Sequence, residues 1–553
     1  QMNRCKKTLR CAYAFSMTYE MITGYLRGFG ISMVPAVLTM LGVCGVRIVW
    51  VYTAFAANRT FDTLLLAYPL SLAVTAALLL GCILLLTGTL LACENVPNIP
   101  DVSGSSAAES SSDVSSEPER KLSAEEWLET LPERDYAGTV FTIAATETGY
   151  VVPADEEEPG LVDIAAVKRN ELIAAKYGVD IQEKALKTGT LATELKNARA
   201  AGVSYADAVL APARDLAAAA AAGELLNLYS LPYFDLSADY MTKPLATDGV
   251  IHNTCYAVYG SATGAENSAW VVYYNRTLLS GAGYDEMERL AASGDWTIGR
   301  LRELAETVAA ETMEKRSPDS SRDIFGYSSY YNDDDFLLSL WQTSGVRAFG
   351  DSAGQPLELR YDFGKAQSAL DELGAFLASK AMFPASGQSA LKAFGEGRLA
   401  FFIYRLDFAA VLAEQNVDWG LLPLPALFAG ETSVSPLDEL TVGLAVPSVQ
   451  TDSERTGLLL NAFFAASHEH MRQALMNNYV HFYLSDNDQA LMLEQILDRV
   501  RADAALLYAP GYANISAVSA DLLTELLRSG GDLERRIEPL RSTFENFAKT
   551  NFR

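Results

Sequence analysis

Residues 138–145 read GTVFTIAA, and this stretch decides the fold of the larger part of the chain. It is short, apolar and rich in β-branched residues, which predicts a buried strand. We expect a helix to follow and to end at Gly178, a residue that suits a helix stop. A second strand should then begin at Val179. The apolar face of the helix would comprise Ile164, Val167, Leu172, Ile173 and Tyr177.

The same alternation of strands and helices continues downstream. A helix is expected over residues 191–201 and a strand over 206–210. Strands that alternate with helices of this length predict an α/β fold with a largely parallel sheet, covered by helices on both faces. Further helices are expected at Lys365–Lys380, Glu454–Ala466, Asp486–Arg501 and Leu533–Lys549.

Composition divides the chain at Cys93. Of 43 basic and 69 acidic residues, seven and two precede Cys93, which leaves 36 and 67 after it. The second part is therefore acidic, and it is long enough to form two lobes with cores of their own. Its negative charge opposes binding to nucleic acid, so we expect no nucleic-acid partner. Cys255 is the one cysteine beyond the division, and we expect it to be a small buried apolar residue.

The dividing residue itself resembles a lipidation site. Leu90-Leu91-Ala92-Cys93 closes a long apolar run and is followed by a linker, residues 93–136, that is rich in Ser and acidic residues. A small residue before a cysteine after an apolar stretch is the pattern that a lipoprotein signal peptidase cleaves. Lipidation of Cys93 would anchor the soluble part on the extracytoplasmic face of the cell membrane. The alternative is an ordinary buried cysteine near the end of a membrane helix.

Residues 1–92 are expected to form a membrane segment. Apolar stretches over 12–26, 31–55 and 61–92 predict two to three transmembrane helices, the last of which merges into the signal-type run. Arg47 lies inside the second stretch. Because a charge within a bilayer is costly, Arg47 should face the interior of a bundle or reach towards the interface.

This segment resembles the C-terminal part of MATE-family efflux transporters over residues 10–80. The resemblance is carried by YEMITGYLRGFG at 19–30, Val34-Pro35, GVCGVRIVW at 42–50 and the helix from Phe61 through Tyr68-Pro69-Leu70. It covers only the last part of such a transporter, so we do not expect transport by this chain alone. By resemblance the last span ends in the cytoplasm, whereas a lipoprotein domain must lie outside. We interpret the two parts as adjacent genes joined in one reading frame or as an assembly artefact.

Residues 137–550 resemble extracellular solute-binding proteins of family 1, the sugar-type binding lipoproteins of ABC importers. The resemblance rests on the order and spacing of several segments over about 400 residues. They are GELLNLYSLPYFDL at 223–236, CYAVYG at 255–260, WVVYYNRTLL at 270–279, GDWT at 294–297, AFGEGRLAF at 393–401, DWGLLPLP at 418–425 and TVGLAVP at 441–447.

The resemblance implies a two-lobe, periplasmic-binding-protein-like fold of type II over residues 137–553, with the ligand held between the lobes. We expect the first lobe to take residues 137–255 and 390–430, and the second to take 260–385 and 441–553. Strands should cross the hinge more than once. The implied function is capture of a mono- or oligosaccharide for delivery to the permease subunits of an ABC importer.

Sugar recognition needs aromatic faces for pyranose rings and fixed polar groups for hydroxyls. The candidates are side chains near expected strand ends, lobe crossings and loops. For any one of the aromatics, packing in the core is the stronger interpretation. Of Tyr273 and Tyr274 one should be core, because neighbours on a strand face opposite sides. The candidate ligand-binding residues are Glu147, Tyr150, Trp270, Tyr273, Tyr274, Tyr331, Asn332, Trp341, Tyr404 and Arg405.

Other patterns argue against catalysis. The sequence has four His residues and no His-Glu-x-x-His, Gly-x-Ser-x-Gly or phosphate-binding loop. We therefore expect no enzyme activity, cofactor or metal, and we interpret Asp333-Asp334-Asp335 as a solvated turn or helix cap. A MATE transporter fragment is the alternative function, and a glycan-active enzyme is a more distant one. A peptide or another small solute also stays open as the ligand.

Overall fold

The computed structural model divides into two units after Glu117. It describes residues 122–146, 150–153, 159–315, 322–331, 333–349, 357–484 and 486–552, together with the short pieces 46–55, 59, 63, 70–72 and 74–75. Most of the expected membrane segment, the expected lipidation site at Cys93 and most of the linker therefore lie outside the described residues. Among the residues described, no helix is both long enough and apolar enough to cross a bilayer.

The described part of the first unit is short. It contains helix α3 (Val46–Trp50), which continues into the π-helix η2 (Val51–Phe55). Arg47 Nε donates a hydrogen bond to Ser71 Oγ at 3.0 Å. Since Ser71 is buried, Arg47 faces a polar partner inside this unit, as the cost of an isolated charge requires.

The first lobe of the second unit is built on a five-stranded mixed sheet. Strand β1 pairs in parallel with β2 and β3, whereas β10 runs antiparallel to β3 and β4. The strand order is β2 (Val179–Ala185), β1 (Thr139–Ala145), β3 (Ala208–Pro212), β10 (Val442–Ala445) and β4 (Ala257–Val258).

Helices cover both faces of this sheet, as predicted. On β1, Ile143 lies in one apolar cluster with Tyr177 and Phe463, and its neighbour Ala144 lies in another with Leu195. This alternation follows from the two-residue period of a strand. The helices of the first lobe are α6 (Ala124–Thr130), α7 (Leu161–Tyr177), α8 (Leu191–Ala200), α9 (Ala213–Ala221), the 3-10 turn η4 (Leu228–Ser230) and α10 (Lys243–Asp248).

Helix α7 ends at Gly178 as predicted, with Gly178 in the left-handed conformation at φ 60°. Its buried face differs from the prediction, because Ile164 and Val167 are 52% and 45% exposed. The buried face instead includes Arg169, whose guanidinium carbon lies 3.9 Å from the ring centre of Phe463. Arg169 Nη2 donates to the carbonyl of Val151 at 2.8 Å, and burial lowers the pKa of Arg169 to about 9.

The second lobe is built on a four-stranded sheet in which β6 and β7 are parallel and β5 runs antiparallel to β7 and β8. The order is β6 (Phe325–Ser329), β7 (Leu399–Arg405), β5 (Trp270–Asn275) and β8 (Trp419–Pro423). Its helices are α11 (Arg276–Gly281), α12 (Met287–Ala292), α13 (Ile298–Val308), α14 (Ala310–Glu314), α15 (Asp334–Gln342), α16 (Phe363–Leu377), α17 (Gln388–Gly395), the 3-10 turn η8 (Leu406–Phe408), α18 (Ala409–Ala413) and α20 (Asn487–Asp498).

These pairings correct the expected lobe boundaries. Strands β7 and β8 fall within the range 390–430 that we assigned to the first lobe, yet both pair with β5. The return to the first sheet is made instead by β10. Periodicity identifies a strand but not the sheet that it joins. The prediction of a largely parallel sheet is also corrected, because both sheets contain antiparallel pairs.

The chain links the lobes at several places. It passes from β4 to β5 through residues 259–269, which form the 3-10 turns η5 (Ser261–Thr263) and η6 (Ala265–Ser268). It returns from β8 to β10 through residues 424–441, where β9 (Ser435–Pro436) pairs with β11 (Val500–Arg501). We call these segments the first and second crossings.

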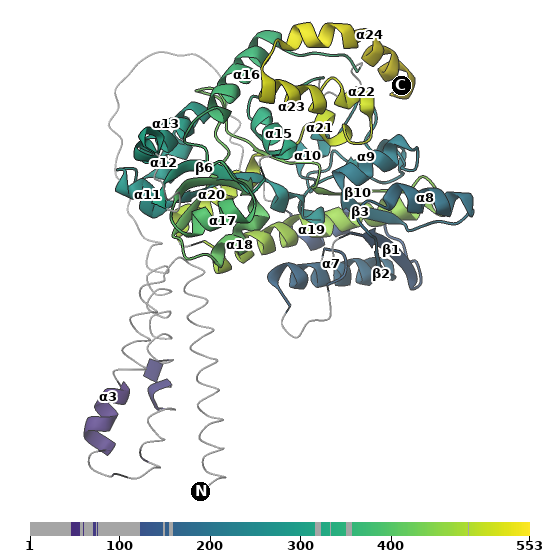
Figure 1. Cartoon of the computed structure of the whole chain (residues 1–553). Coiled ribbons are helices and arrows are strands. Elements are labelled where there is room, and N and C mark those ends of the chain that lie inside the picture. Colours follow the sequence, from purple (N-terminus) through teal and green to yellow (C-terminus); the bar gives the residue numbers. More distant parts are fainter. Residues whose placement is uncertain are drawn as a thin grey trace, which may run out of the picture. The chain divides into compact units, whose positions relative to one another are not determined.

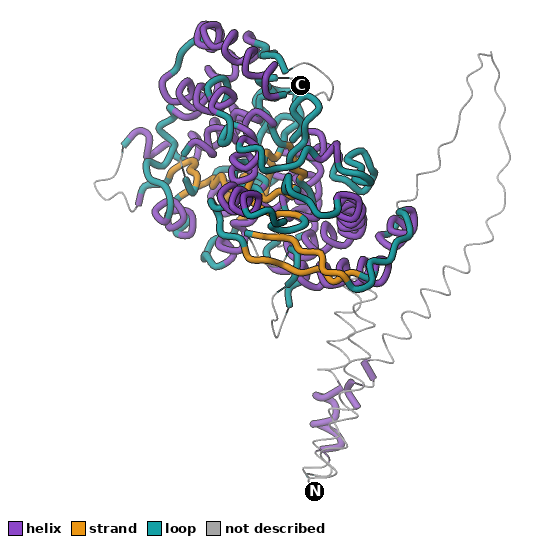
Figure 2. Tube along the Cα trace, turned by 90° about the vertical axis from the view of Figure 1, so that its right-hand side faces the viewer, coloured by secondary structure: helices purple, strands orange, loops and turns teal. Residues whose placement is uncertain are grey.

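Helix α19 (Ser453–Phe482) and the C-terminal helices make further links (Figure 1). Helix α19 packs against α7 and also against α20, which covers β8 of the second sheet. In the tube view one group of strands lies among the helices, and another runs along the lower edge of the unit (Figure 2). The C-terminal helices are α21 (Ala504–Tyr508), α22 (Ala513–Ser516), α23 (Ala520–Ser529) and α24 (Leu533–Asn551). They were expected in the second lobe, but α21 packs against α9 of the first, whereas α23 packs against α15 and α16.

Candidate functional site

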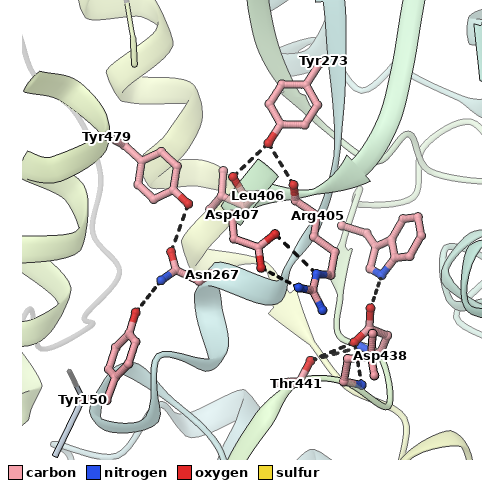
Figure 3. Close-up of polar contacts among 11 residues, drawn as sticks. Tyr150, Asn267, Tyr273, Arg405, Leu406, Asp407, Asp438, Thr441 and Tyr479 are labelled. Atoms are coloured by element: carbon pink, nitrogen blue, oxygen red, sulfur yellow. Dashed lines mark hydrogen bonds and ion pairs between the residues drawn. The ribbon is translucent and has the colours of Figure 1, made fainter. Parts of the chain in front are cut away.

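A chain of hydrogen bonds joins the loop after β1, the first crossing and α19. Asn267 Nδ2 donates to Tyr150 Oη, and Tyr479 Oη donates to Asn267 Oδ1 at 3.0 Å (Figure 3). The ring of Tyr150 packs on Gly264, where a Cβ atom would overlap the ring. Gly264 also has φ +71°, so both space and backbone conformation require glycine there. Tyr150, a predicted site residue, therefore lies at the first crossing.

The two adjacent tyrosines of β5 are both core residues. Tyr273 Oη donates to the carbonyls of Arg405 and Leu406, each at 2.9 Å (Figure 3). Tyr274 points to the other side of the strand, where its hydroxyl contacts Glu288. The sequence predicted one core residue of this pair, but both are buried. We therefore leave both out of the candidate site.

Trp270 and Trp341 are also buried, each with 1% of its surface exposed. Trp270 Nε1 donates to Asp438 Oδ2 of the second crossing at 2.9 Å. Trp341 lies on α15 in the same apolar cluster as Trp270. Since other side chains cover their faces, neither is available for a sugar ring in this structure. The expectation that they stack on a ligand is corrected in favour of core packing.

Four aromatic residues, Tyr330, Tyr331, Tyr404 and Phe408, form what we call the tyrosine cluster. The ring centres of Tyr330 and Tyr331 are 4.6 Å apart, and that of Tyr404 lies 5.4 Å from Tyr330. Tyr331 is 48% exposed, while Tyr404 is partly buried and packs edge-on against Trp270. The predicted residues Tyr331 and Tyr404 thus lie together, with accessible aromatic surface.

A pocket of about 370 Å³ lies beside α15 and the second crossing. Residues 335, 338, 339 and 342 line it from one face of α15, since positions three and four apart share a face. Residues 437–439 line it from the second crossing, and the C-terminal helices complete it. The pocket therefore receives side chains from one lobe, from a segment that joins the lobes, and from helices that contact both.

Four carboxylates, Asp333, Asp335, Asp438 and Glu439, form the acidic cluster of this pocket. Burial first, and then the charges of the other three carboxylates, raise the pKa of Asp335 to about 8, whereas Arg405 opposes the shift. Burial likewise raises the pKa values of Asp438 and Glu439. Within the described residues, no group of three or more His, Cys, Asp or Glu side chains is placed to hold a metal ion.

Arg405, another predicted site residue, lies next to this cluster. Arg405 Nη2 donates to Asp407 Oδ2 at 2.7 Å (Figure 3). Asp438 accepts hydrogen bonds from the backbone N–H of Leu440 at 2.9 Å and from Thr441 Oγ1 at 3.4 Å. The arginine is therefore already paired with one acid, and Asp438 is held by its own segment.

The remaining predictions have mixed outcomes. Glu147 and Asn332 lie outside the described residues. The helix-cap interpretation is confirmed for Asp333, which accepts from the backbone N–H of Phe336 at 3.3 Å. The sequence analysis missed Asp335 and the second crossing as parts of a pocket. The available signal was the acidic pair in PLDEL at 436–440, directly before a strand.

Cys255 is buried as predicted, and burial raises the pKa of its thiol to about 12. Its Sγ donates to the carbonyl of Ala257 at 3.3 Å. This cysteine is thus part of the first lobe's core rather than of the pocket.

Solved structures share the fold at low sequence identity. The cyclic alpha-maltosyl-1,6-maltose binding protein from Arthrobacter globiformis aligns with a TM-score of 0.50 and 14% identity over 75% of this chain and 100% of its own. The sugar-binding protein MalE from Xanthomonas citri aligns at 0.49 and 14%, over 74% and 98% of the two chains. The GacH receptor of Streptomyces glaucescens aligns at 0.47 and 15%, over 74% and 99%.

A search of curated proteins finds no significant match. The family model described as bacterial extracellular solute-binding protein matches residues 169–480, which run from α7 of the first lobe through both crossings to α19. With its two α/β lobes and its pocket beside the second crossing, the chain belongs to the bacterial extracellular solute-binding protein family.

Proposed function

We propose that this protein captures a mono- or oligosaccharide between its lobes and delivers it to the permease of an ABC importer. The proposal rests on a pocket of about 370 Å³ and on the tyrosine cluster, which is linked to it because Tyr404 packs against Trp270 and Trp270 donates to Asp438 of the pocket wall. That volume is within the range of small-molecule sites, and aromatic faces suit the apolar face of a pyranose. The maltosyl-maltose binding protein that shares the fold supports the ligand class.

The arrangement suggests how capture works. A ligand that contacts both α15 and the second crossing favours the state in which both sets of contacts are made. The crossings are the segments that would absorb a change in the angle between the lobes. Loaded and empty protein would then differ in shape, which is what a permease needs in order to distinguish them.

The test is a thermal-shift screen of the full chain against mono- and oligosaccharides, followed by calorimetry. Tyr331→Ala should weaken binding of any hit by roughly tenfold, because it removes one stacking face. Tyr229→Ala is the matched control, since Tyr229 is also 48% exposed but lies on η4 of the first lobe. The absence of binding by every saccharide, or equal loss in both variants, would refute the proposal.

We further propose that Cys93 is lipidated and holds the soluble part at the extracytoplasmic face of the membrane. Support comes from the Leu90-Leu91-Ala92-Cys93 sequence and the Ser- and acid-rich linker behind it. Residues 1–92 would be transmembrane where they are not removed, and their origin from a MATE-type transporter remains part of this proposal. A cleaved or lipid-modified N-terminus at Cys93, read by mass spectrometry of the membrane fraction, would support it.

A further inference from the structure

Two successive residues of the first crossing are bound by side chains of α19. Asn267 accepts from Tyr479, and its neighbour Glu266 accepts at Oε1 from Arg472 Nη1 at 3.5 Å. Arg472 and Tyr479 share one face of the helix, because positions seven apart are almost two full turns apart. Helix α19 therefore contacts the first crossing through a neutral hydrogen bond and, beside it, through an ion pair.

The Glu266 side of this ion pair is buried. The Glu266 side chain has no exposed surface, and its Oε2 has no hydrogen-bond partner among the described atoms. Burial raises the pKa of Glu266, whereas Arg472 and the Ser261 hydroxyl oppose the shift. Because a buried charge that loses its partner is strongly destabilising, Arg472 should stay bound to Glu266.

Arg472 also contacts a carboxylate of the second lobe. Its Nη2 donates to Oδ1 of Asp498, the last residue of α20, and α20 packs on β8 of the second sheet. The Asp498 side chain is 63% exposed and that of Arg472 is 28% exposed. Exposed ion pairs are weak, because water readily replaces either partner. Of the two contacts of Arg472, the one with Asp498 is therefore the easier to break.

We propose that Arg472 is a latch of the hinge, which stays on Glu266 of the first crossing and releases Asp498 of the second lobe when the angle between the lobes changes. Asn267 already ties the first crossing to Tyr150 of the first lobe. Releasing Asp498 would thus free the second lobe without stranding a buried charge. This inference adds a conformational device to the proposed function and does not depend on which ligand is captured.

The experiment is amide hydrogen exchange of the full chain without ligand, read by mass spectrometry over residues 260–269 and 494–499. Both segments contain hydrogen-bonded amides, such as the Asn267 N–H on the Gly264 carbonyl and the Arg499 N–H on that of Ile496. In Asp498→Ala both should exchange about two- to fivefold faster, the effect of losing one exposed ion pair. Added NaCl should speed this exchange in the parent but not in the variant, because salt screens exposed pairs.

Glu494→Ala is the matched control, since Glu494 is an exposed acid one turn earlier on α20 with no ion pair among the described residues. It should leave both segments unchanged. Arg472→Met should speed exchange at least as much as Asp498→Ala, and it should still fold, because Glu266 can then take up a proton. In the Arg472→Met background, Asp498→Ala should add nothing, since both changes break one contact.

Three results would overturn the latch. They are an unchanged rate over residues 260–269 in Asp498→Ala, an equal increase from Asp498→Ala in both backgrounds, and a uniform rise in exchange over both lobes, which would indicate lost stability rather than a released hinge. None of them bears on capture of a saccharide, because no ligand is present in the experiment.

Discussion

Removing the amide of Asn267 should uncouple α19 from the first crossing. Its side chain lies between Tyr150 and Tyr479, and the Tyr479 hydroxyl is buried with Asn267 Oδ1 as its hydrogen-bond acceptor. In Asn267→Ala that hydroxyl loses its partner, which costs about 1–3 kcal/mol of folding free energy. Tyr479→Phe removes the hydroxyl itself and should cost only about 1 kcal/mol. In the double variant no unpaired hydroxyl remains, so we expect its loss to be smaller than the sum by about 1–2 kcal/mol.

The assay is urea unfolding of the four proteins, followed by tryptophan fluorescence and compared at an unchanged denaturant slope. Tyr483→Phe is the control, because it removes a hydroxyl one helical turn further on that makes no hydrogen bond among the described residues. It should change the midpoint little. Losses for Asn267→Ala and Tyr479→Phe that add within about 0.5 kcal/mol would refute the reasoning, because independent sites add in this way.

Four further predictions concern other parts of the chain. Trp341→Ala should lower the free energy of unfolding by roughly 3–5 kcal/mol in chemical denaturation, as for other buried aromatics, and an unchanged midpoint would contradict core packing. The pKa of Asp335 is about 8 in the folded protein and that of an unfolded aspartate about 3.9, so the folded state holds the proton and stability falls as pH rises through this window. Asp335→Asn should therefore raise the melting temperature more at pH 8 than at pH 5, and the reverse order would contradict this sign. Cys93→Ala should abolish incorporation of labelled lipid, and labelling that persists would exclude this residue as the site. Residues 121–553 should give a soluble monomer in size-exclusion chromatography, because the linker has the composition of a disordered spacer; aggregation under several conditions would count against that boundary.

Local patterns predicted the elements of the fold better than their assembly. The content of β-branched residues predicted strand β1, and the glycine at position 178 predicted the end of α7. Helix α19 was predicted only as far as Ala466, since apolar periodicity weakens over its second half while tertiary packing continues the helix to Phe482. The assignment of β7 and β10 to sheets could not be predicted, because strand pairing over 100 or more residues leaves no periodic signal.

Prediction of the candidate site from the sequence was limited in the same way, because the site depends on how distant segments pack. Tyr331 and Tyr404 come together because β6 and β7 are parallel neighbours, so the C-terminal ends of both strands meet at one edge of the sheet. Trp270 and Trp341 were chosen for their large faces, but size also favours burial, and both are in the core. Nothing in the sequence places Asp335 beside Asp438, because that proximity depends on how α15 packs against the second crossing.

Asp438 and Asp335 line the same pocket but differ in their hydrogen-bond partners, which indicates different roles. Asp438 accepts from Trp270, from the Leu440 N–H and from Thr441, so its carboxylate fixes the shape of the second crossing. Asp335 has no such donors and stays in its place because α15 is held by the packing of Phe336 and Leu340 in the core. Asp335 holds its proton at neutral pH and can donate it to an acceptor, whereas the oxygens of Asp438 already accept from their own segment. Under the proposed function, α15 would therefore offer the ligand a carboxyl group that its neighbours do not use, while the second crossing would form another wall of the pocket.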